Sequence, residues 1–318
     1  MTTDLHQELS KEFGLFEAKF RTLIQGDFPV IEPICRQIFK SKGKQLRPLL
    51  VFLTHKLFRE EVSEQAYLAA SLVEIVHAAS LVHDDVVDMA DMRRGNASVR
   101  ALFGNKTAVL AGDYLLAHAF LNAYDKGEHK MLRILVEAIR RMSEGELLQL
   151  QYARNPQANY QTYYRVVECK TAALFRCCCH CGALTAGASP EQLRLCEEIG
   201  NNLGIAFQIQ DDLLDLDTCA PSGKLYGNDL REGKLTLPAL YMLENASVQE
   251  KEAFFRDLEA LGESEGQPDN LIDKIKRSGG EAFAREQALL FREKALNAYK
   301  ALQRPSPLFE ALTEMIFS

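Results

Sequence analysis

The sequence of 318 residues lacks the long hydrophobic runs that membrane-spanning segments require. No stretch of about 18 apolar residues is free of charge, so we expect no transmembrane helix. Residues 1–8 contain neither a cationic segment nor an apolar core, so we expect no signal peptide. Alternating runs rich in Val, Ile and Thr are also missing, which disfavours a β fold. A fixed repeat of roughly 30–45 residues is not visible either, which disfavours a solenoid.

Charge and cysteine content narrow the class of protein further. The net charge of −7, with 25% charged residues, is ordinary for a soluble protein and argues against a general nucleic-acid binder. Three of the eight cysteines are adjacent, Cys177 to Cys179, which is a poor disulfide framework and favours the reducing cytoplasm. Zinc binding by Cys177, His180 and Cys181 is an alternative, but no second ligand cluster is evident. Packing inside a buried helix is the better interpretation.

A helical period dominates the whole chain and predicts an all-α fold. We expect a single domain over residues 1–318, a helical bundle around a deep central cavity. Ser63 is expected to cap a long helix that ends near Asp88, and Ser189 with Pro190 to begin another that ends near Asp217. The other helices are expected at residues 5–25, 28–41, 49–58, 106–125, 128–154 and 160–185, followed by shorter helices after a loop at 219–234.

Two acidic clusters of the same form are the main functional signal. Both have the pattern Asp-Asp-x-x-Asp, both follow an apolar helical run, and both are followed by basic residues. The clusters are Asp84, Asp85 and Asp88, and Asp211, Asp212 and Asp215. In a helix of about 100° per residue, the three carboxylates of one cluster project from one sector. Because the C-terminal end of a helix disfavours acids, a bound cation is the natural reason for them.

The ligand types indicate which cation to expect. One such cluster alone is weak evidence, since acidic clusters usually lie on solvated faces. Two clusters of carboxylates without His or Cys at ligand spacing favour Mg²⁺ over zinc or copper. Mg²⁺ usually takes one or two carboxylates and completes its octahedron with water and phosphate oxygens. We therefore predict that the two clusters face each other and hold a diphosphate through Mg²⁺.

Basic residues beside glycine, proline or the acidic motifs complete this pattern. Arg suits forked contacts with phosphate, whereas Lys acts as a point charge. Each of these residues alone is an ordinary surface charge, but their number suggests two diphosphate sites. They are Lys44, Arg47, Arg93, Arg94, Lys170, Lys224 and Lys234. His77 lies seven residues before Asp84, about two turns away on the same helix face, and is either a ligand contact or a core histidine.

These motifs, in this order, resemble the trans-isoprenyl diphosphate synthase family over nearly the whole chain. The segments that carry the resemblance are residues 43–48, His77, residues 84–95, Lys170-Thr171, residues 207–215, Gly223-Lys224 and Gly233-Lys234. The resemblance implies a homodimer that condenses isopentenyl diphosphate with an allylic diphosphate, such as farnesyl or geranylgeranyl diphosphate. It also implies about three Mg²⁺ ions bridged by the substrate diphosphate, and peripheral membrane contact during product release.

The resemblance also implies a role for each site residue. Asp84, Asp88 and Asp211 correspond to the main Mg²⁺ ligands, and Asp85, Asp212 and Asp215 to nearby or water-mediated partners. The allylic diphosphate would contact Arg93, Lys170 and Lys224. The isopentenyl diphosphate would contact Lys44, Arg47, His77 and Arg94. Thr171, Gln208 and Lys234 would line the reacting centre and, with Lys170, form the catalytic group.

Product length is expected to depend on the helix that carries the first acidic cluster. Val76, Ala79 and Ser80 precede Asp84 by one to two turns, and at about 1.5 Å per residue Ala79 lies roughly 7–8 Å from it along the axis. Ala79 and Ser80 are small, which leaves room for a long chain, although small residues are also common in plain helix packing. The resemblance is greatest to octaprenyl diphosphate synthases and implies a product of about C30–C50, used for example in quinone side chains.

Three alternatives remain at this point. A shorter-chain geranylgeranyl or farnesyl diphosphate synthase would share all the motifs. A terpene cyclase ionises the same substrates, but it needs no second diphosphate site and commonly has an Asn/Ser/Glu metal motif in place of the second cluster. A non-catalytic subunit of a heteromeric synthase typically loses one acidic cluster, and both are intact here.

Overall fold

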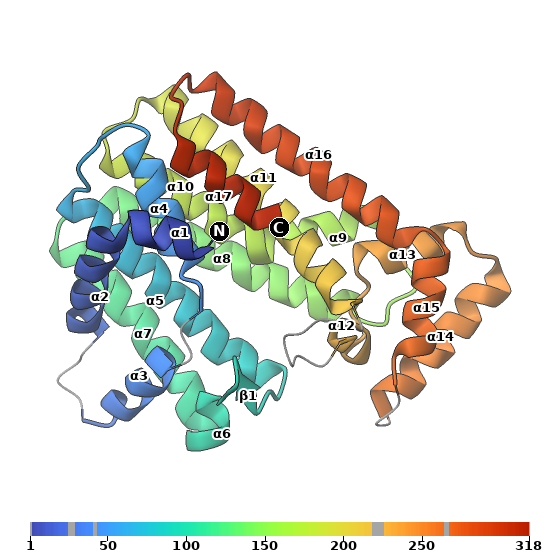
Figure 1. Cartoon of the computed structure of the whole chain (residues 1–318). Helices are drawn as coiled ribbons and strands as arrows, with labels where there is room; N and C mark the ends of the chain where they lie inside the picture. The colour runs from blue at the N-terminus through green and yellow to red at the C-terminus, as the bar shows by residue number, and fades with distance from the viewer. Residues whose placement is uncertain (1, 25–28, 41–42, 218–225, 264–266, 318) are drawn as a thin grey trace.

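The computed structural model describes residues 2–24, 29–40, 43–217, 226–263 and 267–317, and most of them lie in helices (Figure 1). The first helices are α1 (Thr2–Glu8), α2 (Ser10–Ile24), α3 (Ile31–Lys40), α4 (Leu46–Lys56), α5 (Glu64–Val87), α6 (Val99–Phe103), α7 (Asn105–Asp125) and α8 (His129–Tyr152). Between α5 and α6 lies a short antiparallel hairpin, β1 (Met92–Arg93) and β2 (Asn96–Ala97). The predicted all-α class is confirmed.

The second half of the chain continues in the same way. Its elements are α9 (Tyr160–Val167), the π-helix η1 (Glu168–Ala172), α10 (Ala173–Thr185), α11 (Pro190–Asp215), α12 (Asn228–Glu232), α13 (Leu237–Asn245), α14 (Val248–Glu263), α15 (Asp269–Arg277), α16 (Gly280–Ala301) and α17 (Pro307–Phe317). In Figure 1 the orange helices α14 and α15 form a lobe at one end of the molecule, away from α5 and α7.

Helix boundaries follow the capping signals of the sequence in most places. The Ser63 hydroxyl accepts a hydrogen bond from the Ala66 N–H at 3.2 Å, so α5 begins where it was expected. Ser189 forms a capping box with Gln192 at the start of α11. The helix expected at 49–58 begins three residues earlier, which places Pro48 in its first turn, where a missing N–H costs little.

Two expected helices are interrupted. The helix predicted over 5–25 is divided near Leu9, which lets α1 contact α17 while α2 contacts α5. The helix predicted over 160–185 contains the π-helix η1, an irregularity that hydrophobic periodicity alone does not reveal. This second difference affects function, because η1 carries two of the predicted site residues, Lys170 and Thr171.

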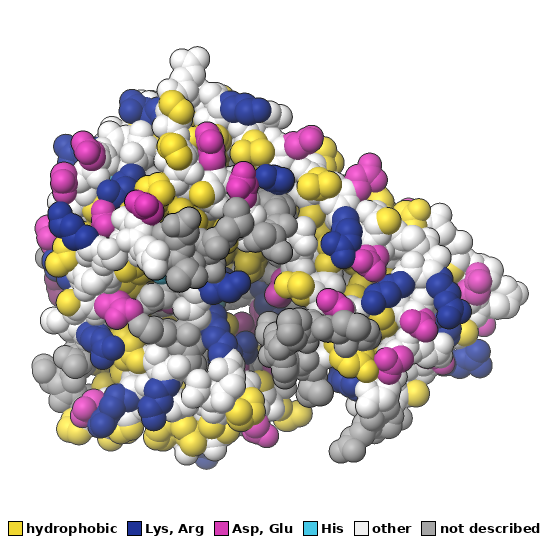
Figure 2. Space-filling model, viewed as in Figure 1, with side chains coloured by type: hydrophobic (Ala, Val, Ile, Leu, Met, Phe, Trp, Pro, Cys, Tyr) yellow, Lys and Arg dark blue, Asp and Glu magenta, His cyan; other side chains and the backbone are white. Residues whose placement is uncertain are grey.

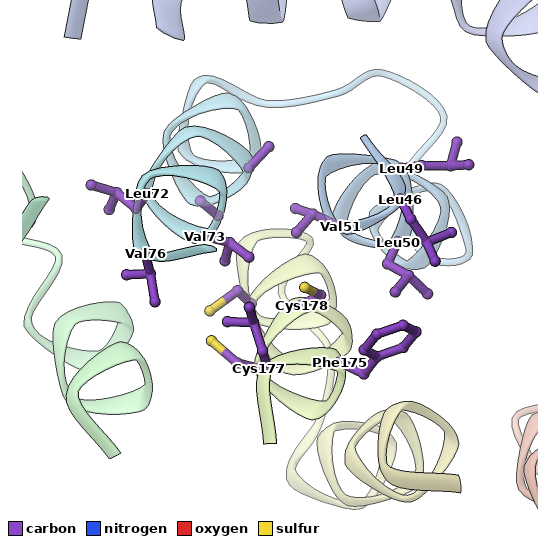
Figure 3. Packing of buried hydrophobic residues seen from close by; sticks show 14 of the residues in the cluster. Leu46, Leu49, Leu50, Val51, Leu72, Val73, Val76, Phe175, Cys177 and Cys178 are labelled. Carbon is purple, nitrogen blue, oxygen red and sulfur yellow. The ribbon is translucent and has the colours of Figure 1, made fainter. Parts of the chain in front are cut away.

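Two long helices, α5 and α11, form the centre of the bundle. Helix α5 packs against α4, α7 and α10, and α11 packs against α10, η1 and α16. Figure 3 shows side chains of α4, α5 and α10 meeting in the core, among them Val51, Val73 and Cys178. Full burial of a Leu, Val or Phe side chain contributes about 2 kcal/mol, so this layer stabilises the position of both helices.

Helix α5 is long and apolar enough to cross a membrane by length and composition alone, although its apolar run is interrupted by the charged residue Glu74. Its most apolar window is, however, 78% buried inside the protein. Ala66, Leu72, Val73 and Ile75 are all fully buried against other helices. The apolar character of α5 is therefore that of a core helix, and the structure gives no sign that it spans a bilayer.

The described cysteines are all free and buried. Cys177, Cys178, Cys179 and Cys181 lie in the main core and are at most 2% exposed. His180 pairs instead with Glu197. No group of three or more His, Cys, Asp or Glu side chains in the described part of the chain is arranged to hold a metal ion by itself. The zinc interpretation therefore has no support, and packing accounts for this cysteine cluster.

Candidate active site

Both acidic clusters lie at the C-terminal ends of the central helices, as predicted. Asp84 and Asp85 are in the last turn of α5, and Asp88 is its C-cap residue. Asp211, Asp212 and Asp215 occupy the last two turns of α11. The carbonyl ends of the helices add a negative potential to that of the carboxylates. The region therefore attracts cations strongly.

Asp85 is held by an arginine of the hairpin. The Nε and Nη2 atoms of Arg93, in β1, donate to its Oδ1 atom at 2.8 and 2.5 Å. Asp85 is 3% exposed, and burial raises its pKa while Arg93 opposes this effect. The contact holds the hairpin against the end of α5. It engages the Asp85 carboxylate and the Arg93 guanidinium with each other.

Asp212 points into the protein and also has partners for both of its oxygens. The hydroxyl of Tyr163, in α9, donates to Oδ2 at 2.6 Å, and Nε2 of Gln208 donates to Oδ1 at 2.9 Å. Thr171 in turn donates to Oε1 of Gln208 at 2.6 Å. Burial raises the pKa of Asp212 to about 7, although both hydrogen bonds oppose the shift. Asp212 is thus the buried member of the second cluster.

Asp215 binds the start of α12. Its two oxygens accept the backbone N–H groups of Asn228 and Asp229 at 3.1 and 3.0 Å. Asp229 itself faces the second cluster, and burial together with Asp212 and Asp215 raises its pKa well above the usual range. Asp229 was not among the residues predicted from the sequence, because it lies 14 residues beyond Asp215 in a segment predicted to be a loop. That prediction was wrong for Asn228–Glu232, which form α12.

Three carboxylates have no hydrogen-bond or ion-pair partner among the described residues: Asp84, Asp88 and Asp211. Asp88 and Asp211 are exposed, and Asp84 is half-buried. Burial raises the pKa of Asp84 to about 6; Glu146 and Asp88 add to this shift, and Lys170 and Arg93 oppose it. Carboxylates that carry negative charge near a helix end without a partner are suited to a cation from outside the chain.

The π-helix η1 places Lys170 beside the first cluster. Lys170 forms an ion pair with Glu146 of α8. The backbone of η1 lies so close to α8 that a Cβ on Gly145 would be 2.5 Å from the Lys170 nitrogen. On the other side, a Cβ on Gly204 would be 2.5 Å from Cα of Ala172. Glycine at these two positions therefore permits the bulge that carries Lys170 and Thr171.

Lys234 connects the two clusters electrostatically. It pairs with Glu232, and although burial lowers its pKa, Asp229, Glu232 and Asp88 raise the pKa above the usual lysine value. The turn before it is fixed by Arg154, whose N–H donates to the Gly233 carbonyl at 2.8 Å. Lys234 therefore lies in the field of Asp88 from α5 and of Asp229 from α12. Lys224, the other predicted lysine of this segment, lies outside the described residues.

Two residues of the predicted isopentenyl diphosphate site, His77 and Arg94, line a cavity of about 50 Å³ near the start of α4 and the middle of α5. Arg93, which was predicted to contact the allylic diphosphate, also lines it, together with Glu74 and Gln45. Burial lowers the pKa of His77 well below its usual value, and the neighbouring arginines lower it further, so this imidazole is neutral. A neutral His77 binds an anion as a hydrogen-bond donor and not as a charge.

Several polar atoms beside this cavity are buried without a partner among the described residues. They are Nε of Arg47, Nε2 of His77 and Oε2 of Glu74. Burial lowers the pKa of Arg47, and the Glu74 carboxylate opposes this shift. Unsatisfied buried polar groups of this kind cost about 1–3 kcal/mol each, so they favour a polar ligand. Lys44 is exposed at the same end of α4.

Figure 2 shows a hollow in this face of the protein, with basic and acidic side chains at its edge. The residues that were predicted to control chain length lie inside the protein, on α5. Val76 and Ala79 are at most 1% exposed and belong to the main core. Ser80 is half-buried, and its hydroxyl donates to the His77 carbonyl at 2.8 Å.

Three further residues of the site were missed by sequence reasoning besides Asp229: Tyr163, Glu146 and Glu74. Each is a partner of a predicted residue on another helix, so no local motif marks it. Glu146 lies within the segment Ser143 to Glu146, where glycine flanked by acids was the only signal. Tyr163 is spaced one helical heptad before Lys170, but a buried tyrosine is ordinarily a core residue.

Comparison with known proteins gives a consistent result. A model of the polyprenyl synthetase family matches residues 28–275. The octaprenyl diphosphate synthase of Escherichia coli is 34% identical over 290 residues, which cover 91% of this chain and 89% of that protein. A geranylgeranyl diphosphate synthase of Sulfolobus acidocaldarius is 36% identical over 268 residues, covering 81% of this chain and 80% of the relative.

Solved structures agree over the full length. The decaprenyl diphosphate synthase of Rhodobacter capsulatus has a TM-score of 0.91 and 33% identity, covering 99% of this chain and 97% of that one. A polyprenyl synthase of Caulobacter crescentus, in complex with calcium and isoprenyl diphosphate, has a TM-score of 0.90 and 30% identity, covering 99% and 96%. On its sequence, its helical architecture and these relatives, the chain belongs to the polyprenyl synthetase family of prenyltransferases.

Proposed function

We propose that this protein condenses isopentenyl diphosphate repeatedly with an allylic diphosphate to make a long-chain trans-polyprenyl diphosphate, with Mg²⁺ as cofactor. The observation that carries the proposal is the set of Asp84, Asp88 and Asp211. These three carboxylates have no partner among the described residues, while the other members of both clusters are engaged within the protein. Such a set is free to bind metal.

The donor chemistry fits Mg²⁺. The available atoms are carboxylate oxygens, and about three ions bridged by the substrate diphosphate would complete their coordination with its oxygens and water. When bound, Mg²⁺ supplies charge stabilisation on the departing diphosphate. The other three carboxylates support the site without binding the metal directly. Asp85 binds Arg93, Asp212 binds Gln208, and Asp215 binds the start of α12. The Caulobacter crescentus neighbour, which is complexed with calcium and isoprenyl diphosphate, supports the proposal that a divalent cation and a prenyl diphosphate bind.

The chain's own residues bind the two substrates. Lys170 and Lys234 stabilise the allylic diphosphate as negative charge builds on it. Arg47, His77 and Arg94, with Lys44 at the entrance, hold isopentenyl diphosphate beside the cavity described above. Holding both substrates in contact removes much of the entropic cost of a reaction between two molecules. The allylic C–O bond breaks to give diphosphate and an allylic cation. The isopentenyl double bond attacks this cation to form the new C–C bond, and the released diphosphate takes the proton that the condensed product loses.

Water must be kept from the cation, because its capture would give an alcohol. The main core supplies apolar walls, with Val76, Ala79 and Val82 of α5 at most 3% exposed. We place the growing chain along α5, past Ser80, Ala79 and Val76. The octaprenyl and decaprenyl relatives support a product of about C30–C50, with C40 as its centre. The geranylgeranyl relative keeps a shorter product as the second candidate.

The assembly and location proposed are a homodimer in the cytoplasm. Helices α7 and α8 each carry an exposed apolar stripe with the same spacing: Leu110, Leu121 and Tyr124, and Val136, Leu147 and Leu150. These residues are 44–68% exposed in the single chain. Exposed apolar stripes of this length on two adjacent helices are typical of a subunit interface.

Incubation of the purified protein with farnesyl and isopentenyl diphosphates and Mg²⁺, followed by mass spectrometry, tests the proposal directly. We expect a polyprenyl diphosphate of about C30–C50. A cyclic hydrocarbon would indicate a terpene cyclase, and absence of any prenyl product from the protein alone would indicate a non-catalytic subunit. Asp84→Ala is expected to abolish Mg²⁺-dependent turnover while circular dichroism shows an unchanged fold.

A further inference from the structure

A continuous chain of hydrogen bonds joins η1, α11 and α9 behind the reacting centre. Thr171 donates to Oε1 of Gln208 at 2.6 Å, and Nε2 of Gln208 donates to Oδ1 of Asp212 at 2.9 Å. The chain ends at Tyr163, whose hydroxyl donates to Oδ2 of Asp212 at 2.6 Å. Both oxygens of Asp212 are therefore occupied by side chains of the protein.

Asp211 and Asp212 differ in their direction despite being neighbours in the sequence. Adjacent residues of a helix point about 100° apart, and here the first is exposed while Asp212 is only 4% exposed. Tyr163 is 7% exposed and belongs to a small core with Ile209 and Leu213. The second acidic cluster thus sends one carboxylate toward solvent and one into the protein.

The hydrogen-bond chain has a fixed direction. A carboxylate oxygen accepts hydrogen bonds, so the amide of Gln208 must turn its NH₂ group toward Asp212. Its carbonyl oxygen then faces Thr171, whose hydroxyl must donate to it and keeps its lone pairs for other contacts. An amide in the opposite orientation would present N–H groups to Thr171 instead. Asp212 thereby determines which atoms of Gln208 and of Thr171 act as hydrogen-bond acceptors.

We infer that Asp212, held in place by Tyr163, is a positioning residue for Gln208 and Thr171 and is not a metal ligand. The inference rests on the proposed function, in which Gln208 and Thr171 line the reacting centre. Oxygen acceptors oriented toward that centre favour an allylic cation, whereas N–H donors oppose it. Loss of Asp212 or of the Tyr163 hydroxyl therefore slows the chemical step and leaves metal binding intact.

The test compares three variants and one control. Tyr163→Phe removes one hydroxyl and keeps the ring in its core, and Asp212→Asn replaces one acceptor by a donor. Asp211→Asn removes the exposed carboxylate of the same cluster. Tyr164→Phe is the matched control, because its hydroxyl bonds to Gln287 at 3.2 Å and takes no part in the chain.

Two measurements separate positioning from metal binding. Mn²⁺ binding in the presence of inorganic diphosphate is followed by electron paramagnetic resonance, and kcat and KM are measured with farnesyl and isopentenyl diphosphates. We expect Tyr163→Phe and Asp212→Asn to bind Mn²⁺ within twofold of the wild type but to lose about tenfold or more in kcat, with KM within threefold. Asp211→Asn should weaken Mn²⁺ binding at least tenfold, and Tyr164→Phe should change neither value more than twofold.

Two outcomes would overturn the inference. One is Mn²⁺ binding that weakens in Asp212→Asn as much as in Asp211→Asn, and the other is an unchanged kcat in Tyr163→Phe. If Asp212→Asn does not fold, Tyr163→Phe decides the question, because its volume and packing are nearly those of the wild type. A wild-type protein that forms no prenyl product would refute the proposed function itself. The two outcomes above, seen in an active enzyme, would refute only the role of Asp212.

Discussion

Lys170 of η1 pairs with Glu146 of α8, one residue after the glycine that lets the two backbones meet. Both side chains are largely buried, at 24% and 19% exposure. The ammonium group pairs with Glu146 and also acts electrostatically on Asp84, whose pKa it lowers against the effect of burial. Glu146 restricts Lys170 to one position while no substrate is bound.

We predict that Glu146→Gln lowers kcat/KM for the allylic diphosphate by about tenfold. A charge-assisted hydrogen bond of this kind contributes about 1.5 kcal/mol, and its loss lets Lys170 adopt other rotamers. Steady-state kinetics with farnesyl diphosphate as the varied substrate measure the effect. Glu144→Gln is the control: it removes ion pairs with Arg140 of α8 and Arg165 of α9, neither of which involves Lys170, and should change kcat/KM less than twofold.

The stability of the metal-free protein should depend on Asp84. Burial raises its pKa from 3.8 to about 6, so the folded protein binds this proton more tightly than the unfolded chain does. The stabilising contribution of the protonated form is complete below about pH 4 and is lost as the pH rises through 6. Asp84→Asn is therefore expected to raise the free energy of unfolding at pH 7 by about 1–2 kcal/mol, allowing for partial solvent screening.

Urea denaturation in the presence of a chelator, at pH 4, 5, 6 and 7, measures this prediction. The gain in Asp84→Asn should grow over that range and vanish at pH 4, which provides an internal control. A variant that is less stable than the wild type at pH 7 would contradict the interpretation of Asp84 as an unpartnered, half-buried carboxylate.

The sequence was sufficient to predict where the two clusters lie, because a serine cap followed by more than 20 residues of helical period defines both α5 and α11. The spacing of the residues alone was not sufficient to separate the available carboxylates from the engaged ones. Only the family resemblance set Asp84, Asp88 and Asp211 apart from the other three. The direction of Asp212 depends on Tyr163, which reaches it from α9, 49 residues earlier in the chain. Contacts of this kind form only when helices pack, and no local spacing specifies them.

The π-helix is a second feature that depends on tertiary structure. Residues 160–185 have the periodicity of one continuous helix, which is what the sequence predicts. The extra residue of η1 is accommodated because Gly145 and Gly204 leave space on both sides. These glycines lie on α8 and α11, so the cause of the bulge is distant from the segment that contains it.

Product length should respond to the small residues of α5. Ala79→Tyr is expected to shorten the product to about C15–C20 while turnover persists, because the ring would occupy the path of the chain. Ala79 is fully buried, and overpacking costs about 1–3 kcal/mol, so Ser80→Phe at a half-buried position is the companion variant. Mass spectrometry of the product checks both, and unchanged length in two folded, active variants would remove these positions from the tunnel.

The homodimer should depend on the apolar stripes of α7 and α8. Leu147, at 68% exposure, is in the middle of the α8 stripe, so Leu147→Asp would place a charge in the interface and is expected to weaken dimerisation at least a hundredfold. Val248 on α14 is equally exposed, at 67%, but lies outside both stripes, so Val248→Asp is the matched control. Sedimentation equilibrium should give a monomer for Leu147→Asp and a dimer for the wild type and Val248→Asp.

Since Leu147 lies one residue after Glu146, loss of the dimer should also reduce kcat through the position of Lys170. A wild-type monomer with full activity would show that the stripes serve another partner.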